Sequence, residues 1–557
     1  MSFSNKLLDT VFRIEYLIIA AVAMVYGMIF LYIPNGISCD EGYYLMGYLQ
    51  KQELGPMVND FHNIVRFITP DSMQDNVLYF RYLRFVLDFM SALLFGIVSN
   101  NWIRQNFGFS LNKVVYVGLV MLGASIGYTY TTATISFDHL QHIIYFFAIS
   151  FFLASDLATR KPSKIMLQLF TGCFLTLAIT NYLPSGLLLL LVFMFLTVVN
   201  YPYPSAISKI VLIILSLVVG FFLYHLFINP IGNYIDNVFT SIKVASDGVT
   251  RHDSASLILK MLTAIGVFVL VQIPFVILGS LSMKVKTNIK IAIVISILIV
   301  ATLFIFRKIY LLQGYLYYLP VSFVLGLYFA ENGLYVAKKT ISNLLLFVIL
   351  SFLPFMGVFG TNQSIISKIM IFMPFWACMF MVLLDQLDID KRKINLMLFV
   401  VMALYSLGYL YQGNFRRYHS YYTPRSSKYE LTMGDRYKKI NVSAYEQNYY
   451  QTFADTLRSI GFKPGCTALA FGEQQIGLYL MGGYFHGPLV YSVNQYVKIP
   501  KERAPYLFLF KKEEHNTIQQ LRNSGWNFPG GYQRIEIETM AQNLDAEYHN
   551  TVIYYLK

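Results

Sequence analysis

Residues 14–44 of the chain read IEYLIIAAVAMVYGMIFLYIPNGISCDEGYY. The run from Ile14 to Ile33 is long and apolar enough to cross a hydrocarbon core of about 30 Å as a helix. It lacks a convincing small-residue cleavage site, so we expect a retained first transmembrane helix rather than a signal peptide. Two adjacent carboxylates, Asp40 and Glu41, follow where this helix should leave the bilayer. Chemistry at a membrane surface needs such groups and packing in lipid does not, so both are candidate site residues.

The composition predicts a membrane protein. Of the 557 residues, 56% are hydrophobic and 13% are charged, whereas soluble domains are about 25% charged. Apolar runs recur along most of the chain, which indicates a polytopic α-helical membrane protein with the lipid bilayer as its partner. A net charge of +13 can indicate nucleic-acid binding. Here, however, the positive residues alternate with apolar runs, as the positive-inside rule describes, so we expect no nucleic-acid partner.

The apolar runs predict about thirteen membrane spans. Lysine and arginine gather in every second connection, which predicts a cytoplasmic N-terminus and an external C-terminus. The fifth and sixth spans could instead form a re-entrant hairpin around residues 181–184. The spans are expected roughly at 14–33, 82–99, 113–129, 139–156, 166–181, 185–200, 210–228, 257–280, 290–306, 315–331, 342–360, 367–385 and 394–412.

Two domains are expected from this pattern. Residues 1–412 form the membrane domain, whose outer loop 34–81 carries the acidic pair and apolar residues at helical spacing, as in helices that lie on a membrane surface. Residues 413–557 are less hydrophobic and predict an external soluble α/β domain. Its expected helices are 443–460 and 517–523, and its expected strands are 467–471, 489–493, 506–510, 534–537 and 552–556.

A second polar cluster lies at the outer mouth of the fourth predicted span. Asp138 and His142 are four residues apart, so they share one helix face. Ionisable groups are costly there unless they face water or a cavity. Two interpretations remain open: an interfacial helix start capped by Ser136 or Asp138, or a metal site for which Asp40, Asp138 and His142 are possible ligands.

Several cations are predicted on the outer side, where the positive-inside rule disfavours them. Arg307 and Lys308 are adjacent, and Arg81 and Arg84 stand at the outer start of the second span. Such residues can anchor a helix at the membrane surface, with the hydrocarbon part of the side chain along apolar surface and the charged end in water. They can also bind an anionic phosphate, which is the second interpretation of these four residues.

An Asp-Glu pair in the first outer loop, followed by surface helices, resembles the GT-C superfamily of glycosyltransferases, which take sugars from polyprenyl-phosphate donors. Within it the chain is most similar to the protein O-mannosyltransferase and aminoarabinose-transferase group. Residues 136–138, Ser-Phe-Asp, lead into an apolar helix where this group has a second aspartate. The expected spans and external α/β domain resemble the aminoarabinose-transferase layout. The motifs cover most of residues 1–200, and the rest matches by architecture alone.

The resemblance implies transfer of a sugar to a glycan, lipid or protein acceptor on the periplasmic side of the inner membrane, in cell-envelope modification. Asp40 would accept the acceptor's proton. Glu41 and Asp138 would support it or hold a divalent metal ion as an optional cofactor. Arg307 and Lys308 would contact the donor phosphate.

Two other functions remain open. A transporter or flippase for a lipid-linked glycan would share the spans and the buried cations. It would not need a carboxylate pair in an outer loop or a large external domain. An O-antigen polymerase or ligase is another membrane glycosyltransferase with large outer loops. The sequence does not define the sugar or the acceptor.

Overall fold

The chain is mainly helical, and seven of its described helices are long and apolar enough to cross a membrane. The computed structural model describes residues 14–37, 41–55, 59–110, 112–128, 133–246, 254–282, 313–332, 338–360, 365–387, 429–431, 440–472, 474–490, 504–537 and 550–556, with isolated positions between 290 and 408. The predicted spans at 290–306 and 394–412 fall largely outside these ranges.

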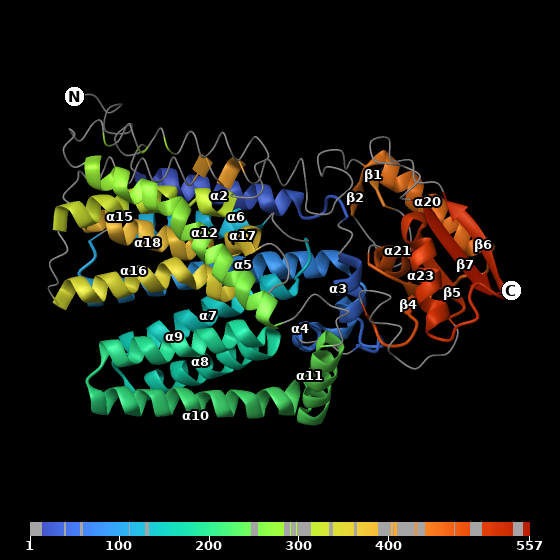
Figure 1. Cartoon of the computed structure of the whole chain (residues 1–557), viewed down its shortest axis with the longest axis horizontal. Coiled ribbons are helices and arrows are strands. Elements are labelled where there is room, and N and C mark those ends of the chain that lie inside the picture. Colours follow the sequence, from blue (N-terminus) through green and yellow to red (C-terminus); the bar gives the residue numbers. More distant parts are fainter. Residues whose placement is uncertain are drawn as a thin grey trace.

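Most of the long helices run roughly along the longest axis of the molecule (Figure 1). The seven are α2 (Ile14–Tyr32), α5 (Val77–Phe107), α7 (Phe137–Leu157), α8 (Lys161–Asn181), α9 (Leu183–Asn200), α10 (Tyr203–Phe227) and α12 (Ser254–Leu281). Shorter helices in the bundle are α6 (Lys113–Tyr128), α14 (Gln313–Leu316), α15 (Leu319–Asn332), α16 (Lys338–Gly357), α17 (Ile365–Lys368), the 3₁₀ turn η3 (Ile369–Phe372) and α18 (Met373–Asp385). Both α8 and α9 are span candidates, which favours two full spans over a re-entrant hairpin.

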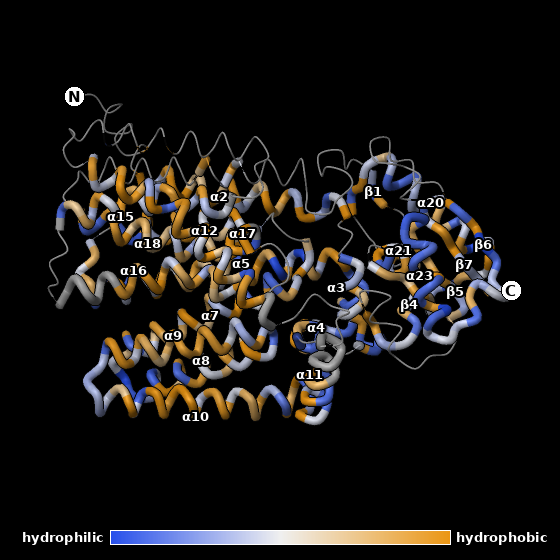
Figure 2. Tube along the Cα trace, in the orientation of Figure 1, coloured by the Kyte–Doolittle hydropathy of each residue, from blue (hydrophilic) through white to orange (hydrophobic). Residues whose placement is uncertain are grey.

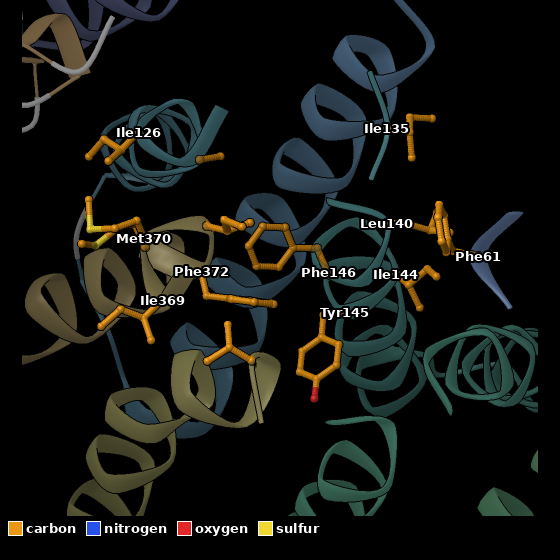
Figure 3. Close-up of a cluster of buried hydrophobic side chains, with 14 of the residues drawn as sticks. Phe61, Ile126, Ile135, Leu140, Ile144, Tyr145, Phe146, Ile369, Met370 and Phe372 are labelled. Atoms are coloured by element: carbon orange, nitrogen blue, oxygen red, sulfur yellow. The ribbon is translucent and has the colours of Figure 1, made fainter. Parts of the chain in front are cut away.

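The bundle core is aromatic and aliphatic. Figure 3 shows Phe146 of α7 beside Phe372 of η3, and Tyr145 lies on the same side of the helix, with its ring centroid 5.5 Å from that of Phe372. Phe146 also stacks on Phe95 of α5, with ring centroids 4.9 Å apart. At the periphery, α10 leaves Phe222 and Leu226 exposed, and Figure 2 shows hydrophobic residues along its length. An exposed apolar face on a long helix is what a bilayer covers, so the bundle is built for lipid.

Short helices lie at one end of the bundle (Figure 1). α3 (Glu41–Tyr48) and α4 (Phe61–Ile68) belong to the first outer loop, together with the 3₁₀ turn η1 (Asp71–Met73). α11 (Ile231–Ser246) runs across the direction of α10. α4 is amphipathic as expected, with Ile64 and Val65 buried and the polar Asn63 and Arg66 partly exposed. α3 differs from the expectation of a surface helix, because nearly all of its residues are buried.

The last part of the chain forms a five-stranded mixed sheet beside α3 and α4 (Figure 1). Its strands are β3 (Thr467–Ala470), β4 (Tyr484–Phe485), β5 (Tyr506–Phe510), β6 (Tyr532–Ile537) and β7 (Thr551–Leu556), in the order β4-β3-β5-β7-β6. β3 is parallel to both neighbours, and β7 is antiparallel to β5 and β6. The helices are α20 (Ala444–Ser459), α21 (Gln474–Leu480) and α23 (Lys511–Asn523), and a separate pair of short strands is β1 (Tyr429–Glu430) and β2 (Asn441–Val442).

Local signals explain which of these elements were predictable. Ser443 and Glu446 form a capping box at the start of α20, a pattern visible in the sequence. The expected strand at 489–493 is not found in its described part, because Leu489 makes only an isolated bridge with Leu54. α21 was not predicted. Its seven residues are all buried, so it lacks the one-sided apolar pattern that marks a surface helix.

A buried ion pair ties α7 to α10 within the bundle. Lys209 contacts Asp156, which also accepts hydrogen bonds from Tyr201 Oη at 2.9 Å and Trp102 Nε1 at 3.2 Å. Both charged side chains are more than nine-tenths buried. Removing one partner would leave the other charge buried and unpaired, which costs about 3–5 kcal/mol.

We therefore predict that Asp156→Asn lowers the free energy of unfolding by about 3–5 kcal/mol. Thermal melting of the purified protein in detergent measures the effect. Asp455→Asn is the matched control, because Asp455 pairs with Arg458 on an exposed helix face, where such a change costs within about 0.5 kcal/mol. Equal melting temperatures for the two variants would contradict the prediction.

Candidate functional site

The candidate site is built around a buried ion pair between Glu41 and Arg81. Glu41 is the first residue of α3 and Arg81 lies in the second turn of α5, and neither side chain is exposed. Arg81 Nε donates to Glu41 Oε1 at 2.8 Å, and Nη2 donates to Oε2 at 2.7 Å. This bidentate arrangement is the strongest form of a charge-assisted hydrogen bond between these side chains.

The same guanidinium also holds the segment that follows α2. Arg81 Nη1 donates to the Ile33 carbonyl and Nη2 donates to the Gly36 carbonyl, both at 2.8 Å. One side chain thus fixes the chain before and after residues 38–40. Those three residues include Asp40 and lie outside the described ranges.

A second set of charges continues one turn further along α5. Arg84 Nε lies 3.5 Å from Asp88 Oδ2, and Arg84 Nη2 donates to the Tyr128 carbonyl at 2.5 Å. The guanidinium also lies over the Tyr128 ring, 4.0 Å from its centroid. Asp88 Oδ1 is 3.2 Å from His142 Nδ1 of α7. Arg84 and Asp88 are four residues apart, so the helical repeat alone brings them together.

A third ion pair joins α7 to α17. Lys368 Nζ lies 2.7 Å from each carboxylate oxygen of Asp138, and it also lies 4.6 Å from the ring centroid of Phe137. Ser136 caps α7, as expected, by accepting from the His139 backbone N–H. Asp138 is therefore an ion-pair partner in the first turn of α7, where a negative charge also suits the positive end of the helix dipole.

These pairs form one group, here called the outer charge cluster. Arg84 interacts electrostatically with Glu41 as well as with Asp88, and His139 interacts with both Arg84 and Lys368. The cluster consists of Glu41, Arg81, Arg84, Asp88, Asp138, His139, His142 and Lys368. Its three cations balance its three carboxylates, which is how charges are accommodated in a membrane bundle.

The structure brings together five of the predicted site residues, which are Glu41, Arg81, Arg84, Asp138 and His142. Asp40, Arg307 and Lys308 lie outside the described residues. The phosphate hypothesis for Arg81 fits this geometry poorly, because Arg81 already donates to Glu41 and to two carbonyls and is fully buried.

The metal hypothesis finds no complete ligand set in the described part of the chain, which contains no group of three or more His, Cys, Asp or Glu side chains able to hold an ion. Both Asp138 oxygens face Lys368, and His142 Nδ1 faces Asp88. The residues that are described therefore do not fit a metal centre.

Sequence reasoning missed Asp88 and Lys368. Both are charged residues inside predicted spans, which is a functional signal by itself because such residues are costly in lipid. The spacing from Arg84 to Asp88 could have identified the first. The second has its partner 230 residues away in the chain, so no local pattern reveals it.

Asp60 anchors α4 against the bundle near this cluster. Its carboxylate accepts hydrogen bonds from Tyr224, from Asn229 Nδ2 at 2.8 Å and from Asn63 Nδ2 at 2.7 Å. Burial raises the pKa of Asp60, and these donors oppose the rise. His62 lies two residues further along, in the first turn of α4, and packs among Tyr43, Tyr48 and Phe61. Burial lowers the pKa of His62 well below its usual 6.5, so the ring is neutral when α4 is in place.

An apolar cavity of about 50 Å³ lies in the bundle, between α5, α6, α7, α9, α16 and α18. Trp102, Phe152, Phe193 and Leu350 are among the residues that line it, and no member of the outer charge cluster does. The cavity is therefore separate from the candidate site.

Comparison of the chain with models of protein families gives no match, and comparison with curated proteins gives no significant match.

We predict that the Glu41–Arg81 pair behaves as a coupled unit. Arg81→Gln or Glu41→Gln alone leaves one buried charge unpaired and should cost about 3–5 kcal/mol of folding free energy. The double variant removes both charges and should recover a large part of that loss. Thermal melting of the three variants measures the coupling. A double variant as unstable as the sum of the single ones would contradict it.

We predict a pH dependence from His62. Because its pKa is lower in the folded state than in the unfolded state, the unfolded chain binds a proton at His62 first as the pH falls below about 6.5. The free energy of unfolding therefore decreases over this range, and above it His62 is neutral in both states and has no such effect. Melting of His62→Gln between pH 7.5 and 5.5 should show a smaller decrease than the unmodified protein. His515→Gln, at an exposed position, is the control and should leave the decrease unchanged. Parallel pH profiles for all three proteins would exclude this role.

Proposed function

We propose that the chain is an integral-membrane glycosyltransferase that moves a sugar from a polyprenyl-phosphate donor to an acceptor hydroxyl or phosphate on the outer side of the membrane. The supporting observation is the position of the acidic motif. Arg81 fixes the chain on both sides of residues 38–40 at the end of a lipid-exposed bundle. A carboxylate there can reach both a lipid-linked donor and an acceptor in water.

The finer architecture belongs to this proposal. It comprises about thirteen spans, a cytoplasmic N-terminus, an external α/β domain at residues 413–557, and location in the inner membrane of a bacterium. The alternation of lysine and arginine between the apolar runs supports this orientation.

The chemistry needs a base and a cationic site. Asp40 takes the proton of the acceptor hydroxyl as the acceptor oxygen bonds to the anomeric carbon. The bond from that carbon to the donor phosphate breaks, and the lipid phosphate leaves with the bonding electrons. Cations stabilise its developing charge, a role we assign to Arg307 and Lys308. The proposed step does not use a metal ion, because Asp138 faces Lys368 and His142 faces Asp88.

The described residues narrow the roles of the other carboxylates. Glu41 has both oxygens on Arg81 and is fully buried, and Asp138 has both oxygens on Lys368. A carboxylate that already balances a cation is a poor base. Both are therefore positioning residues in this proposal, and Asp40 remains the base.

The direct test is product analysis. The purified protein in lipid nanodiscs is incubated with radiolabelled polyprenyl-phosphate sugars and with glycan, lipid or protein acceptors, and labelled products are separated. A glycosylated acceptor supports the proposal. Movement of the donor between vesicle leaflets without any transfer product would favour a flippase instead.

We predict that Asp40→Asn reduces turnover by about 10²–10⁴-fold, the usual contribution of a positioned general base. The change keeps the size of the side chain, so melting temperature and donor affinity should be preserved. Asp75→Asn is the matched control, since Asp75 is an exposed carboxylate of the same outer loop. Initial rates at saturating donor measure the effect. Near-normal turnover of Asp40→Asn would remove Asp40 from the mechanism.

A further inference from the structure

Residues 440–490 contact the first outer loop directly at the segment that Arg81 holds. Asn441 N donates to the Pro34 carbonyl at 2.9 Å, and Gly36 N donates to the Asn441 carbonyl at 2.7 Å. The side chains of Asn35 and Asn441 are also hydrogen-bonded, at 3.0 Å. Gly36 therefore has two bonds with different partners: its N–H binds Asn441 and its carbonyl binds Arg81.

A second contact lies on the other side of the same ion pair. α3 packs on α21, and Gly42, the residue after Glu41, lies against the backbone of α21. A Cβ atom at Gly42 would be 2.1 Å from Ile476 N and 2.6 Å from the Gln475 carbonyl carbon. Contacts below 3.0 Å do not occur for real side chains. The approach of α3 to α21 thus requires glycine at this position.

A third contact follows along the loop after α3. Gln52 Nε2 donates to the Gly487 carbonyl at 3.0 Å, and Gln52 Oε1 accepts from Phe485 N at 2.8 Å. The backbones continue the pairing, because Leu489 N donates to Glu53 O at 2.8 Å and Gly55 N donates to Leu489 O at 3.0 Å. Gln52 is buried, so these bonds are protected from water.

We propose that residues 440–490 are a positioning element of the candidate site, which holds the Glu41–Arg81 ion pair from the outer side. The contacts stand on both sides of that pair, at Gly36 and at Gly42. Arg81 fixes the loop to the bundle, and the C-terminal segment fixes it against movement away from the bundle. The segment is then part of the site rather than an independent appendage. The effect on turnover rests on the proposed function, whereas the effect on loop order does not.

The experiment uses the full chain and three variants. Gly42→Ala places a methyl group where α21 lies. Gln52→Ala removes the side-chain bonds to residues 485 and 487 without adding bulk, and it covers the case in which Gly42→Ala fails to fold. Gly27→Ala in α2 is the matched control, because a Cβ there meets nothing within 4 Å. Two readouts are taken: hydrogen exchange of peptides covering 41–55 and 474–490, and the kinetic constants for transfer.

Both test variants should exchange faster in these peptides, by about tenfold or more, because the contact protects them. The turnover number should fall about 10- to 100-fold, since a displacement of about 1 Å at a reacting centre can cost about 100-fold. KM for the donor should stay within about twofold, because the proposed contact positions the loop and does not itself bind the donor. Gly27→Ala should change none of these.

Unchanged exchange in both test variants would overturn the positioning contact itself. Faster exchange with unchanged turnover would also overturn the proposal, because the loop would then be held without effect on the reaction. A higher KM together with a lower melting temperature would indicate general destabilisation. This result would also contradict the positioning proposal. Absence of transfer by the unmodified protein would contradict the proposed function, while the exchange result would still decide whether residues 440–490 hold the loop.

Discussion

The ion pair between Glu41 and Arg81 is the interaction on which the outer end of the molecule depends. Two charges are removed from water, which costs several kcal/mol per ion. The cost is offset because Arg81 makes four hydrogen bonds, two to the carboxylate and two to backbone carbonyls. The end of α2, the start of α3 and the second turn of α5 meet at this one side chain. Their relative positions follow from its planar geometry.

The buried charges around this ion pair are also balanced by charges of opposite sign. Arg84 is balanced by Asp88 and Lys368 by Asp138, so the outer charge cluster carries no net charge when its histidines are neutral. Balanced pairs suit the inside of a bundle with an apolar exterior, because an unpaired buried ion is costly. The proposed base, Asp40, directly precedes Glu41 of this cluster in the sequence and lies outside the described residues.

The sequence predicted those features that depend on local pattern. Apolar runs indicated most of the long helices, and the pattern Ser443 to Glu446 indicated the start of α20. The sequence indicated Glu41 as half of an acidic pair after the first apolar run, and Arg81 and Arg84 as cations on the predicted outer side. It indicated Asp138 and His142 as ionisable groups at the mouth of a predicted span. Their partners were not predictable in the same way. Arg81 meets Glu41 across 40 residues and Lys368 meets Asp138 across 230, and packing alone decides such pairs. The burial of α3 was missed for the same reason, since α21 lies more than 400 residues further along the chain.

The separations along the chain also set an order for assembly during synthesis. A ribosome makes Glu41 and Arg81 within a short interval, so this pair can form as soon as α5 has been inserted. Asp138 enters the membrane region long before Lys368 has been made. Until then its carboxylate must stay hydrated or protonated, or bind a temporary cation. The bond between Asn35 and Asn441 spans 406 residues and is among the last to form. The contact between Asn35 and Asn441 therefore reports that nearly the whole chain has been translated.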